Sequence, residues 1–569
     1  MSKAAMAVTC EQRYRQVLPR LSDYVAYHAR TKPNSIALIE HNTGIKVSWK
    51  KFDQAMNAFA AKLLGIGLRK GDVIATSLPL LKEHIFLEYA CFRVGIIIAP
   101  LDLRLKTQEV IDAFARVAPK AYFFLGLTPR ADFRPIVREV MRAAPSCKTW
   151  VQFQQGRDGI LDGAQHVGDF SADIKKRFIV SMLSGSVRRA ARKVGTRDPA
   201  LIIFTTGSTG SPKAAMLAHK NILVQNIGIC AAFGTTNADS VLINLPPSHV
   251  GCQTELLMTA VYVGGTAVIL HIFDAEQSLV AMANHKVTLC GQIPALFAME
   301  WRLPNYASYD LKSLRAALYS GQAVDRPFLT RLKQMAPSIG GGFGLTEAAG
   351  LCTCTPLDWT IDEVLGSVGF NLPLCPMSIR EPMAADGSAG REKPNGEVGE
   401  ICFSGPQVFL GYMNDETATR KTISSDGWCY TGDLGSIDER GVHLAGRAKF
   451  VIKPKGYQVF PAEVENFITD AFKDRVLSTA CVGVKHEVWA EAIVAFVELR
   501  DGSAVGRDEL KEKVKVIAAY KRPNHYIFVK QGEMPLNRVA KVDYLALTAT
   551  AEQEIEKLRQ EGKWDRPLA

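Results

Sequence analysis

The chain has 569 residues, of which 47% are hydrophobic and 22% charged, and this composition excludes a disordered protein. The length exceeds what one hydrophobic core supports, so we expect two or more domains. The formal net charge of +11 is a mild bias over this length and does not indicate a nucleic-acid partner.

Cysteine usage and the apolar segments predict a soluble protein. The twelve cysteines form no CxxC pair, which favours buried free thiols over a cysteine-bound metal, and the N-terminal residues contain no apolar signal core. The longest apolar stretch, residues 86–101, is short for a membrane span and contains Glu88 and Arg93. We therefore expect a cytoplasmic protein without integral membrane contact.

Helix-like and strand-like segments alternate through the first two thirds of the chain. Residues 51–67 predict a helix that ends in glycine, and residues 72–79 predict a buried strand. Residues 82–95 predict a second helix, and residues 95–101 a second buried strand. This alternation is typical of α/β layering with much parallel sheet.

The densest basic run comes next, at residues 186–197 (SVRRAARKVGTR). Such a run is most often a solvated loop or helix face. The alternative is a positively charged rim that attracts a polyanionic small molecule, such as one carrying several phosphates.

The pattern changes after about Gly446. Residues 461–472 predict an amphipathic helix, residues 478–486 and 492–499 predict strands, and residues 507–520 predict a further helix. The tail, residues 551–569, is expected to be an exposed charged helix followed by disorder. These elements suffice for a separate small α+β domain.

The predicted fold class is therefore α/β, with a large N-terminal domain of layered sheets and helices and a small, mobile α+β C-terminal domain. We place the large domain at residues 1–448 and the small domain at residues 449–569.

A polar loop, TTGSTGSPKAA at residues 205–215, follows the apolar run ALIIF and precedes a helix-like segment, NILVQNIGICAAF. Its backbone N–H groups and hydroxyls can bind phosphate oxygens, Gly207 and Gly210 allow close approach, and Lys213 supplies a cation. The loop does not match the P-loop pattern, because Pro212 precedes the lysine and Ala214 follows it. Taken alone, the loop is compatible with phosphate binding and with an ordinary polar connection.

The loop resembles the signature of the adenylate-forming superfamily, which contains acyl-CoA synthetases, nonribosomal-peptide adenylation domains and luciferases. Five further motifs occur in the order typical of that superfamily: LPPSHVG from Leu245, GFGLTE from Gly342, YTGD from Tyr430, GRAKFVIKPKGYQVFPAEVE from Gly446 and PLNRVAK from Pro535. Together the motifs extend the resemblance over nearly the whole chain.

The resemblance implies that the protein uses ATP, Mg²⁺ and coenzyme A. Phe343 would pack near adenine, Asp433 and Arg447 would contact the ribose, and Glu347, preceded by Thr346, would hold Mg²⁺ through its carboxylate. The nucleotide-binding residues implied are Thr205, Thr206, Gly207, Ser208, Thr209, Gly210, Lys213, Gly321, Gln322, Ala323, Gly342, Phe343, Gly344, Leu345, Asp433 and Arg447.

The acid-binding part of the site is expected near His249, a ring at the boundary between the phosphates and the acyl pocket. The resemblance gives His249 a gating or positioning role. The other residues expected to line the acyl pocket are Gly251, Cys252, Gln253, Gly340 and Gly341, with the segment Gly321 to Ala323 on its border.

Two lysines of the small domain are implied in different half-reactions. Lys541 matches the lysine that contacts the carboxylate and the α-phosphate during adenylation, although Ala540 stands where the superfamily usually has glycine. Lys453 lies in the segment that the superfamily presents for thioester formation, where Lys455, Gly456 and Tyr457 would contact coenzyme A. The implied hinge between the two arrangements is Lys449.

We therefore predict an AMP-forming acyl-CoA synthetase. The small residues Gly340 to Gly342 and the thiol Cys252 favour an aromatic, alicyclic or medium-chain acid over acetate. The alternatives are a luciferase-like oxygenase, an enzyme that loads a carrier protein, and a non-catalytic member that binds acyl groups or nucleotides. No carrier domain follows Lys541, which favours free coenzyme A, and the wrong P-loop spacing argues against a kinase. A homodimer is left open.

Overall fold

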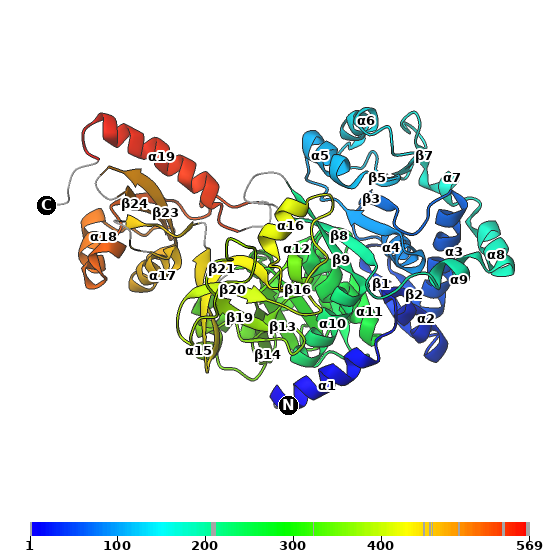
Figure 1. Ribbon diagram of the computed structural model, residues 1–569, viewed down its shortest axis with the longest axis horizontal. Helices are drawn as coiled ribbons and strands as arrows, with labels where there is room; N and C mark the ends of the chain where they lie inside the picture. Colours follow the sequence, from blue (N-terminus) through cyan, green and yellow to red (C-terminus); the bar gives the residue numbers. More distant parts are fainter. Residues whose placement is uncertain are drawn as a thin grey trace. The chain divides into compact units, whose positions relative to one another are not determined.

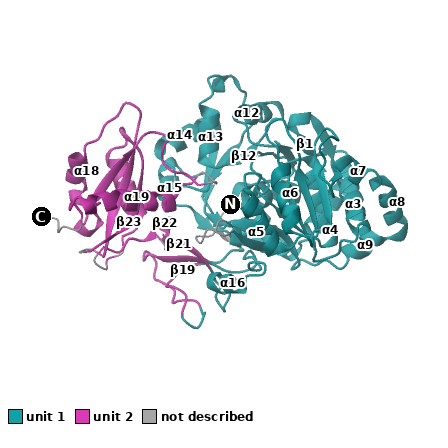
Figure 2. Cartoon of the chain, turned by 90° about the horizontal axis from the view of Figure 1, so that it is seen from above, with its two compact units in different colours: residues 1–377, 385–388, 403–429 teal, residues 378–384, 389–402, 430–569 magenta. Residues whose placement is uncertain are grey.

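The computed structural model describes residues 3–205, 212–322, 324–447, 450–454, 457, 459–487, 490–537 and 541–564. The chain divides into two compact units (Figure 2). Unit 1 comprises residues 1–377, 385–388 and 403–429, and unit 2 comprises residues 378–384, 389–402 and 430–569. The domain boundary expected after residue 448 stays a prediction.

Unit 1 is built on two seven-stranded sheets, each parallel except for one edge strand (Figure 1). The first has the order β7 (Gln165–His166), β6 (Thr149–Phe153), β5 (Ala121–Leu125), β3 (Val73–Ser77), β4 (Ile97–Pro100), β8 (Pro199–Thr205) and antiparallel β9 (Lys213–Ala218). The second has the order β14 (Ser338–Gly342), β13 (Ala316–Ser320), β12 (Leu289–Gln292), β10 (Ser240–Ile243), β11 (Thr266–Ile269), β1 (Ile36–Glu40) and antiparallel β2 (Ile45–Ser48). Continuous apolar runs such as that of β4 form strands that are buried on both faces, and this confirms the predicted α/β layering.

Helices cover these sheets and supply most of the core of unit 1. Their bounds are α1 (Lys3–Arg15), α2 (Leu21–Thr31), α3 (Trp49–Gly65), α4 (Lys82–Val94), α5 (Thr107–Val117), α6 (Arg134–Ala143), α7 (Val167–Ser171), α8 (Ile174–Ser184), α9 (Ser186–Ala191), α10 (His219–Phe233), α11 (Met258–Val263), α12 (Ala275–Asn284), α13 (Pro294–Trp301), α14 (Arg326–Met335), α15 (Ile361–Gly366) and α16 (Glu416–Thr422). Helices α4 and α10 are buried on nearly all sides, as expected for central helices. The predicted helices at 51–67 and 82–95 correspond to α3 and α4, and α4 ends at Gly95 with a positive φ of 77°.

Four short strands and two special turns connect the second sheet to the candidate site. The strands are β15 (Gly344–Leu345) paired with β16 (Gly350–Leu351), and β17 (Thr353–Cys354) paired with β18 (Phe370–Asn371). The segment Gly251–Leu257 is a π-helix, and Thr346–Ala348 forms a single 3₁₀ turn. π-Helices are rare and occur often at functional sites.

The described part of unit 2 contains two sheets and three α-helices. The first sheet has the order β19 (Met377–Arg380), β20 (Gly399–Phe403), β21 (Cys429–Asp438) and β22 (Gly441–Arg447), and the ends of β19, β20 and β21 extend to residues of unit 1. The second has the order β23 (Val476–His486), β24 (Ala490–Leu499) and β25 (His525–Val529), and the helices are α17 (Pro461–Ala471), α18 (Arg507–Lys513) and α19 (Tyr544–Gln560). Along β24, Ile493, Ala495 and Val497 pack in one cluster with α17 and α18, while Val494 and Phe496 pack in another with α19.

Two predictions for this C-terminal part were wrong in detail. The helix expected at 507–520 ends at Lys513, and two 3₁₀ turns follow, because the β-branched Ile517 adopts an extended conformation. The tail helix is not exposed on all sides, since Ala551 and Ile555 of α19 are fully buried in the core of unit 2. The disorder predicted for the end of the chain falls on residues 565–569, which lie outside the described residues.

All twelve cysteines are buried thiols, and no disulfide joins them in the described part of the chain. Among the helices described, none is both long and apolar enough to cross a membrane.

Candidate active site

The predicted phosphate loop connects two strands rather than a strand and a helix. Thr205 at the end of β8 pairs with Lys213 at the start of β9, so the two strands form an antiparallel pair. Helix α10 begins only at His219, after β9, and its N-terminus therefore does not follow the loop directly, contrary to our expectation. The predicted contacts of Thr206, Gly207, Ser208, Thr209 and Gly210 lie outside the described residues.

A cation, an aromatic ring and a carboxylate lie close together at the start of β9. The Lys213 ammonium lies 5.0 Å from the centre of the Tyr412 ring, and the Tyr412 hydroxyl donates a 2.6 Å hydrogen bond to Glu347 Oε1. Backbone hydrogen bonds hold the tyrosine beside β9: Met413 N donates to Ala214 O at 2.8 Å and Met216 N donates to Gly411 O at 3.0 Å. The structure thus brings together Lys213 and Glu347, as expected, through a tyrosine that the sequence did not reveal.

Burial fixes the protonation state of this tyrosine. Tyr412 is only 6% exposed. Loss of water, followed by the negative charge of Glu347 and the hydrogen bond to it, raises the pKa of the phenol far above its ordinary value. Tyr412 is therefore a protonated hydrogen-bond donor at neutral pH.

The turn that carries Glu347 is held by side chains from two other segments. Ala349 ends the 3₁₀ turn with φ of 58°, a conformation that alanine rarely adopts. Thr254 Oγ1 donates to Ala349 O at 2.6 Å, and Gln407 Nε2 donates to Ala348 O at 2.9 Å and to Leu351 O at 2.7 Å. Because the turn is fixed at several points, the half-buried Glu347 and its neighbour Thr346 have defined positions.

The glycines before this turn are explained by close packing. A Cβ on Gly342 would lie 2.3 Å from Thr353 O, and one on Gly344 would lie 2.2 Å from Gly350 O. A Cβ on Gly341 would lie 2.7 Å from the Tyr319 ring, and one on Gly340 would contact two leucines and a phenylalanine. Close packing against side chains and a backbone carbonyl therefore accounts for glycine at residues 340–342, and their place in the acyl pocket stays a prediction.

Phe343 directly follows β14, and β14 pairs with β13. The Phe343 ring centre lies 6.1 Å from that of Phe403, which is fully buried, so one part of the ring serves the core. Gly321 follows β13 with φ of 99°, and Gln322 follows it. Ala323 lies outside the described residues, and Leu345 is half-buried in β15.

His249 directly precedes the π-helix. Its Nδ1 accepts a hydrogen bond from Gly251 N at 3.0 Å, so the neutral ring carries its proton on Nε2. The residue is exposed, which leaves room for a ligand beside the ring.

The predicted acyl-pocket residues Gly251, Cys252 and Gln253 lie within the π-helix and are buried. Burial raises the pKa of the Cys252 thiol well above its ordinary value, so Cys252 is an uncharged group. Gln253 Nε2 donates to Pro247 O at 3.1 Å, and its Oε1 is buried without a hydrogen-bond partner among the described residues.

The π-helix also carries an acidic residue that the sequence reasoning missed. Burial raises the pKa of Glu255 to about 7, although the carboxylate accepts a hydrogen bond from the Leu351 backbone N–H. Gly350 lies against this side chain with φ of 125°, where a Cβ would approach Glu255 Cγ to 2.8 Å. The available signal was an ionisable residue directly before the mainly apolar run LLMTAVYV at residues 256–263.

Unit 2 brings together three of the expected nucleotide-binding and catalytic residues. Asp433 and Arg447 are cross-strand partners in β21 and β22, and Arg447 Nε lies 2.9 Å from Asp433 Oδ1. Lys541 follows in the short antiparallel turn before α19, where its backbone N–H donates to Asn537 Oδ1 at 3.1 Å. Although the residue as a whole is exposed, loss of water around its ammonium and the charge of Arg447 lower the pKa of Lys541, while Asp433 opposes the shift.

The segment expected to contact coenzyme A lies in unit 2 and is described in part. Ile452 and Val459 pair through two backbone hydrogen bonds of 3.0 and 2.8 Å. Lys453 and Tyr457 are exposed there, and the Tyr457 ring stacks on Tyr520 with centres 4.5 Å apart. Lys449, Lys455 and Gly456 lie outside the described residues.

A cavity of about 130 Å³ lies within unit 2 and is lined by Asp433, Arg447, Phe450, Glu465 and Tyr544 among others. Glu465, which accepts a 2.9 Å hydrogen bond from the Tyr544 hydroxyl, has its pKa raised to about 7 by burial.

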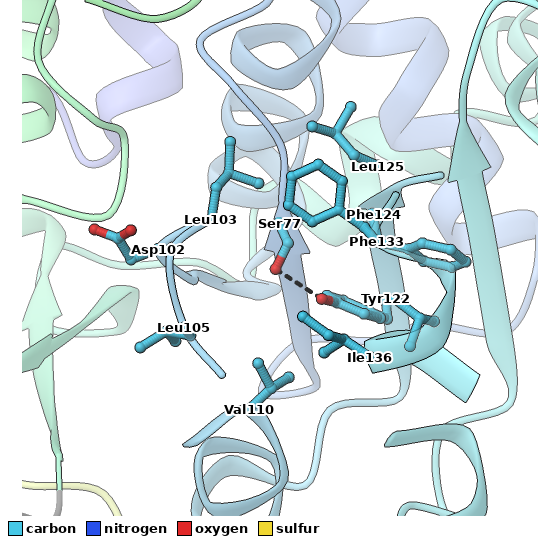
Figure 3. A pocket seen from close by; sticks show the side chains of 11 residues that line it. Ser77, Asp102, Leu103, Leu105, Val110, Tyr122, Phe124, Leu125, Phe133 and Ile136 are labelled. Atoms are coloured by element: carbon cyan, nitrogen blue, oxygen red, sulfur yellow. Dashed lines mark hydrogen bonds between the residues drawn. The ribbon is translucent and has the colours of Figure 1, made fainter. Parts of the chain in front are cut away.

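A second cavity lies in unit 1 and is shown in Figure 3. Its walls are mainly apolar, Tyr122 donates a 2.7 Å hydrogen bond to Ser77 across it, and the carboxylate of Asp102 points away from it. Its volume of about 20 Å³ holds no more than a water molecule, so it is not an acid-binding pocket.

No cluster of three or more histidine, cysteine, aspartate or glutamate side chains suited to a metal occurs among the described residues. A metal at this site would rely on ligand oxygens together with a single protein carboxylate. This is the usual arrangement for Mg²⁺ in phosphate-binding sites, and Glu347 fits it.

Comparison with known families identifies the class. Residues 25–413 match the model of the AMP-binding enzymes, and residues 463–541 match the model of the AMP-binding enzyme C-terminal domain. The chain therefore belongs to the AMP-binding enzyme family, which is the adenylate-forming superfamily expected from its motifs.

Individual relatives narrow the class. The 4-coumarate–CoA ligase CCL1 of Humulus lupulus is 27% identical, covering 89% of each chain, and the medium-chain acyl-CoA ligase ACSF2 of Danio rerio is 27% identical, covering 92% of this chain and 87% of its own. ATP-bound MatB from Rhodopseudomonas palustris has the same fold, with a TM-score of 0.76 at 23% identity over 94% of this chain and 99% of MatB. The protein is accordingly an AMP-forming carboxylic acid–CoA ligase that uses ATP and coenzyme A.

Proposed function

We propose that the enzyme activates an aromatic, alicyclic or medium-chain carboxylic acid with ATP and transfers the acyl group to coenzyme A, releasing AMP and pyrophosphate. The observation that carries this proposal is the convergence of Lys213, Tyr412 and Glu347 at the base of the polar loop, because these groups suit a charged phosphate ligand.

In the first half-reaction, a carboxylate oxygen of the acid attacks the α-phosphorus of ATP, and the bond to pyrophosphate breaks. Negative charge increases on the phosphate oxygens as this happens, so fixed cations lower the barrier. Lys213 fills this role from β9, and Lys541 fills it from unit 2. Asp433 and Arg447 bind the ribose and hold the nucleotide in place for the attack.

Glu347 would hold Mg²⁺ through its carboxylate, kept in place by the Tyr412 hydroxyl. When bound, Mg²⁺ would neutralise phosphate charge. The role of the protein is to fix the Glu347 carboxylate. Thr254 and Gln407 anchor the turn at residues 346–349, so this carboxylate has little freedom to move.

In the second half-reaction, the thiol sulfur of coenzyme A attacks the acyl carbonyl carbon. The thiol loses its proton, the carbon–sulfur bond forms, and the carbon–oxygen bond to AMP breaks. We assign the exposed residues Lys453 and Tyr457, together with Lys455 and Gly456, to the binding of coenzyme A. A rotation about Lys449 would withdraw Lys541 from the reacting groups and present these residues instead.

The acid class is supported by the buried wall formed by Gly251, Cys252 and Gln253, and by the aromatic and medium-chain acids in the names of the two ligases compared above. His249 would close this wall against the phosphates. Gly340 and Gly341 pack against neighbouring side chains, so their small size is not evidence for a large acid.

A screen of carboxylic acids for CoA-thioester formation, combined with ATP–pyrophosphate exchange, tests the proposal. We expect ATP–pyrophosphate exchange with cinnamic-type, alicyclic or medium-chain acids. The folded variant Glu347→Gln should need a higher Mg²⁺ concentration for exchange than the wild type. Exchange without thioester formation would favour a carrier-protein loader, and binding without exchange would favour a non-catalytic member. Unchanged Mg²⁺ dependence in Glu347→Gln would remove this residue from the metal site.

A further inference from the structure

Helix α8 presents apolar side chains to solvent. Ile179 is 58% exposed, Val180 56%, Met182 67% and Leu183 86%. At about 100° per residue these four positions fall within an arc of about 160° on the helix. Single exposed apolar residues are normal, but four within five positions form a patch that calls for a partner. We refer to these four residues as the α8 patch.

The opposite side of helix α8 is held in unit 1, so the helix has a defined orientation that leaves the α8 patch exposed. Ser181, which lies between the patch residues in sequence, is buried, and its hydroxyl accepts hydrogen bonds from Ser186 Oγ at 2.9 Å and Val187 N at 3.3 Å. Helix α8 ends at Gly185 with φ of 66°, and α9 follows directly. Figures 1 and 2 both show α8 at an outer edge of unit 1.

Basic side chains surround the α8 patch. The segment 174–193 contains seven lysines and arginines and no acidic residue, and Lys175, Lys176, Arg188 and Arg189 are exposed. The nearest acidic residue on the preceding turn, Asp173, already forms ion pairs with Lys62 and Arg177. The patch therefore carries a local positive charge that the chain itself does not neutralise.

We propose that the α8 patch and its basic surround form a peripheral docking surface for an anionic lipid bilayer. The four apolar side chains would enter the interface, while the lysines and arginines remain at the level of the lipid phosphates. Charge complementarity selects this partner. A second copy of the chain, placed symmetrically on the patch, would bring two sets of exposed lysines and arginines together and would be repelled.

The sequence left two roles open for the basic run at residues 186–197: a solvated face, or a rim that attracts a polyanionic small molecule. The docking surface is a third role for these residues. Lipid headgroups present the same phosphate chemistry as coenzyme A, but in a plane beside an apolar phase, which also accounts for the exposed side chains of α8. The docking does not depend on which acid the enzyme uses.

Co-sedimentation of the full-length protein with lipid vesicles tests the proposal. We expect binding to phosphatidylcholine vesicles that contain phosphatidylserine to be at least about tenfold stronger than to phosphatidylcholine alone, and to weaken as salt is raised. The double variant Met182→Ser/Leu183→Ser should lose about tenfold in binding, and Arg188→Gln/Arg189→Gln should lose the preference for phosphatidylserine. The matched control is Val516→Ser, which changes a residue of unit 2 that is 76% exposed.

The substituted residues are all exposed, so the variants should keep the ATP–pyrophosphate exchange rate measured without vesicles. Equal binding to both kinds of vesicle, or unchanged binding by both double variants, would overturn the proposal. A wild-type dimer that Met182→Ser/Leu183→Ser converts to a monomer would instead assign the patch to self-association. A raised KM for coenzyme A in Arg188→Gln/Arg189→Gln, with vesicle binding intact, would assign the basic run to that substrate.

Discussion

Replacing Tyr412 by phenylalanine removes one hydroxyl from the candidate site and leaves the rest of the side chain in place. The ring stays packed against Phe409, whose centre lies 4.9 Å away, and stays beneath the Lys213 ammonium at 5.0 Å. The 2.6 Å hydrogen bond to Glu347 is lost, together with the interaction of the hydroxyl with the Thr422 side chain. Because the ring stays in place, the variant tests mainly the positioning of this carboxylate.

The expected size of the effect follows from the charge of the acceptor. A hydrogen bond to a charged group contributes about 1.5 to 3 kcal/mol, more than a bond between neutral groups. If the whole amount is lost in the transition state, the rate of adenylation falls by a factor of about 10 to 150. Part of it will be recovered when Glu347 turns toward water, so we expect about tenfold. The effect should be independent of pH, because the raised pKa of Tyr412 keeps the phenol protonated.

The assay is ATP–pyrophosphate exchange measured across a series of Mg²⁺ concentrations. We expect Tyr412→Phe to need more Mg²⁺ and to lose rate at saturation, with its melting temperature little changed. Tyr309→Phe is the matched control, since its hydroxyl donates a 3.2 Å hydrogen bond to Glu276 away from the site. If Tyr412→Phe behaves like Tyr309→Phe, the tyrosine does not position Glu347 and this reasoning is refuted.

Three further predictions concern other groups. Lys541→Ala should slow acyl-AMP formation by about a hundredfold while sparing thioester formation from supplied acyl-AMP, and equal losses in both half-reactions would contradict the assigned role. Lys449→Pro fixes φ at about −65°, so it should suppress one half-reaction more than the other, and parallel changes with intact circular dichroism would argue against a hinge there. Between the ordinary pKa of 4.5 and the raised value of about 7, folded Glu255 keeps a proton that the unfolded chain has lost, so stability falls as pH rises through this window. Urea unfolding should show that Glu255→Gln removes up to about 3 kcal/mol of this decline, whereas Glu276→Gln, at an exposed site, should show the wild-type slope.

The layered α/β fold was predictable because its strands have a sequence pattern of their own. Strand β4 is apolar along its whole length and strand β3 begins with three apolar residues, as is typical of strands buried on both faces, and the helix between them ends at a glycine. Strand β9 was missed for the opposite reason. Its sequence, KAAMLA, contains no β-branched residue, and its extended form depends on pairing with β8 and on hydrogen bonds from residues 410–413.

The candidate site was predictable where a motif carried it and not where distant contacts did. Glu347 and Asp433 lie in recognisable motifs, whereas Tyr412 is about two hundred positions from Lys213 and no local pattern separates it from a core aromatic residue. Gly340 and Gly341 show the same limit. Their small size suggested space, but whether a neighbour already fills that space depends on side chains such as Tyr319, which only the folded chain brings near.

The π-helix links the two parts of the site in unit 1. Thr254 and Glu255 are consecutive residues, yet Thr254 donates to Ala349 O while Glu255 accepts from the Leu351 backbone N–H. Both therefore fix the segment 349–351, which directly follows the turn that carries Glu347. The residues just before them, Cys252 and Gln253, are those we assign to the acyl pocket. If this short helix lines the acyl pocket as we propose, an acid that displaces it would also displace the carboxylate proposed to hold Mg²⁺, and binding of the acid would be coupled to the geometry of the phosphate site.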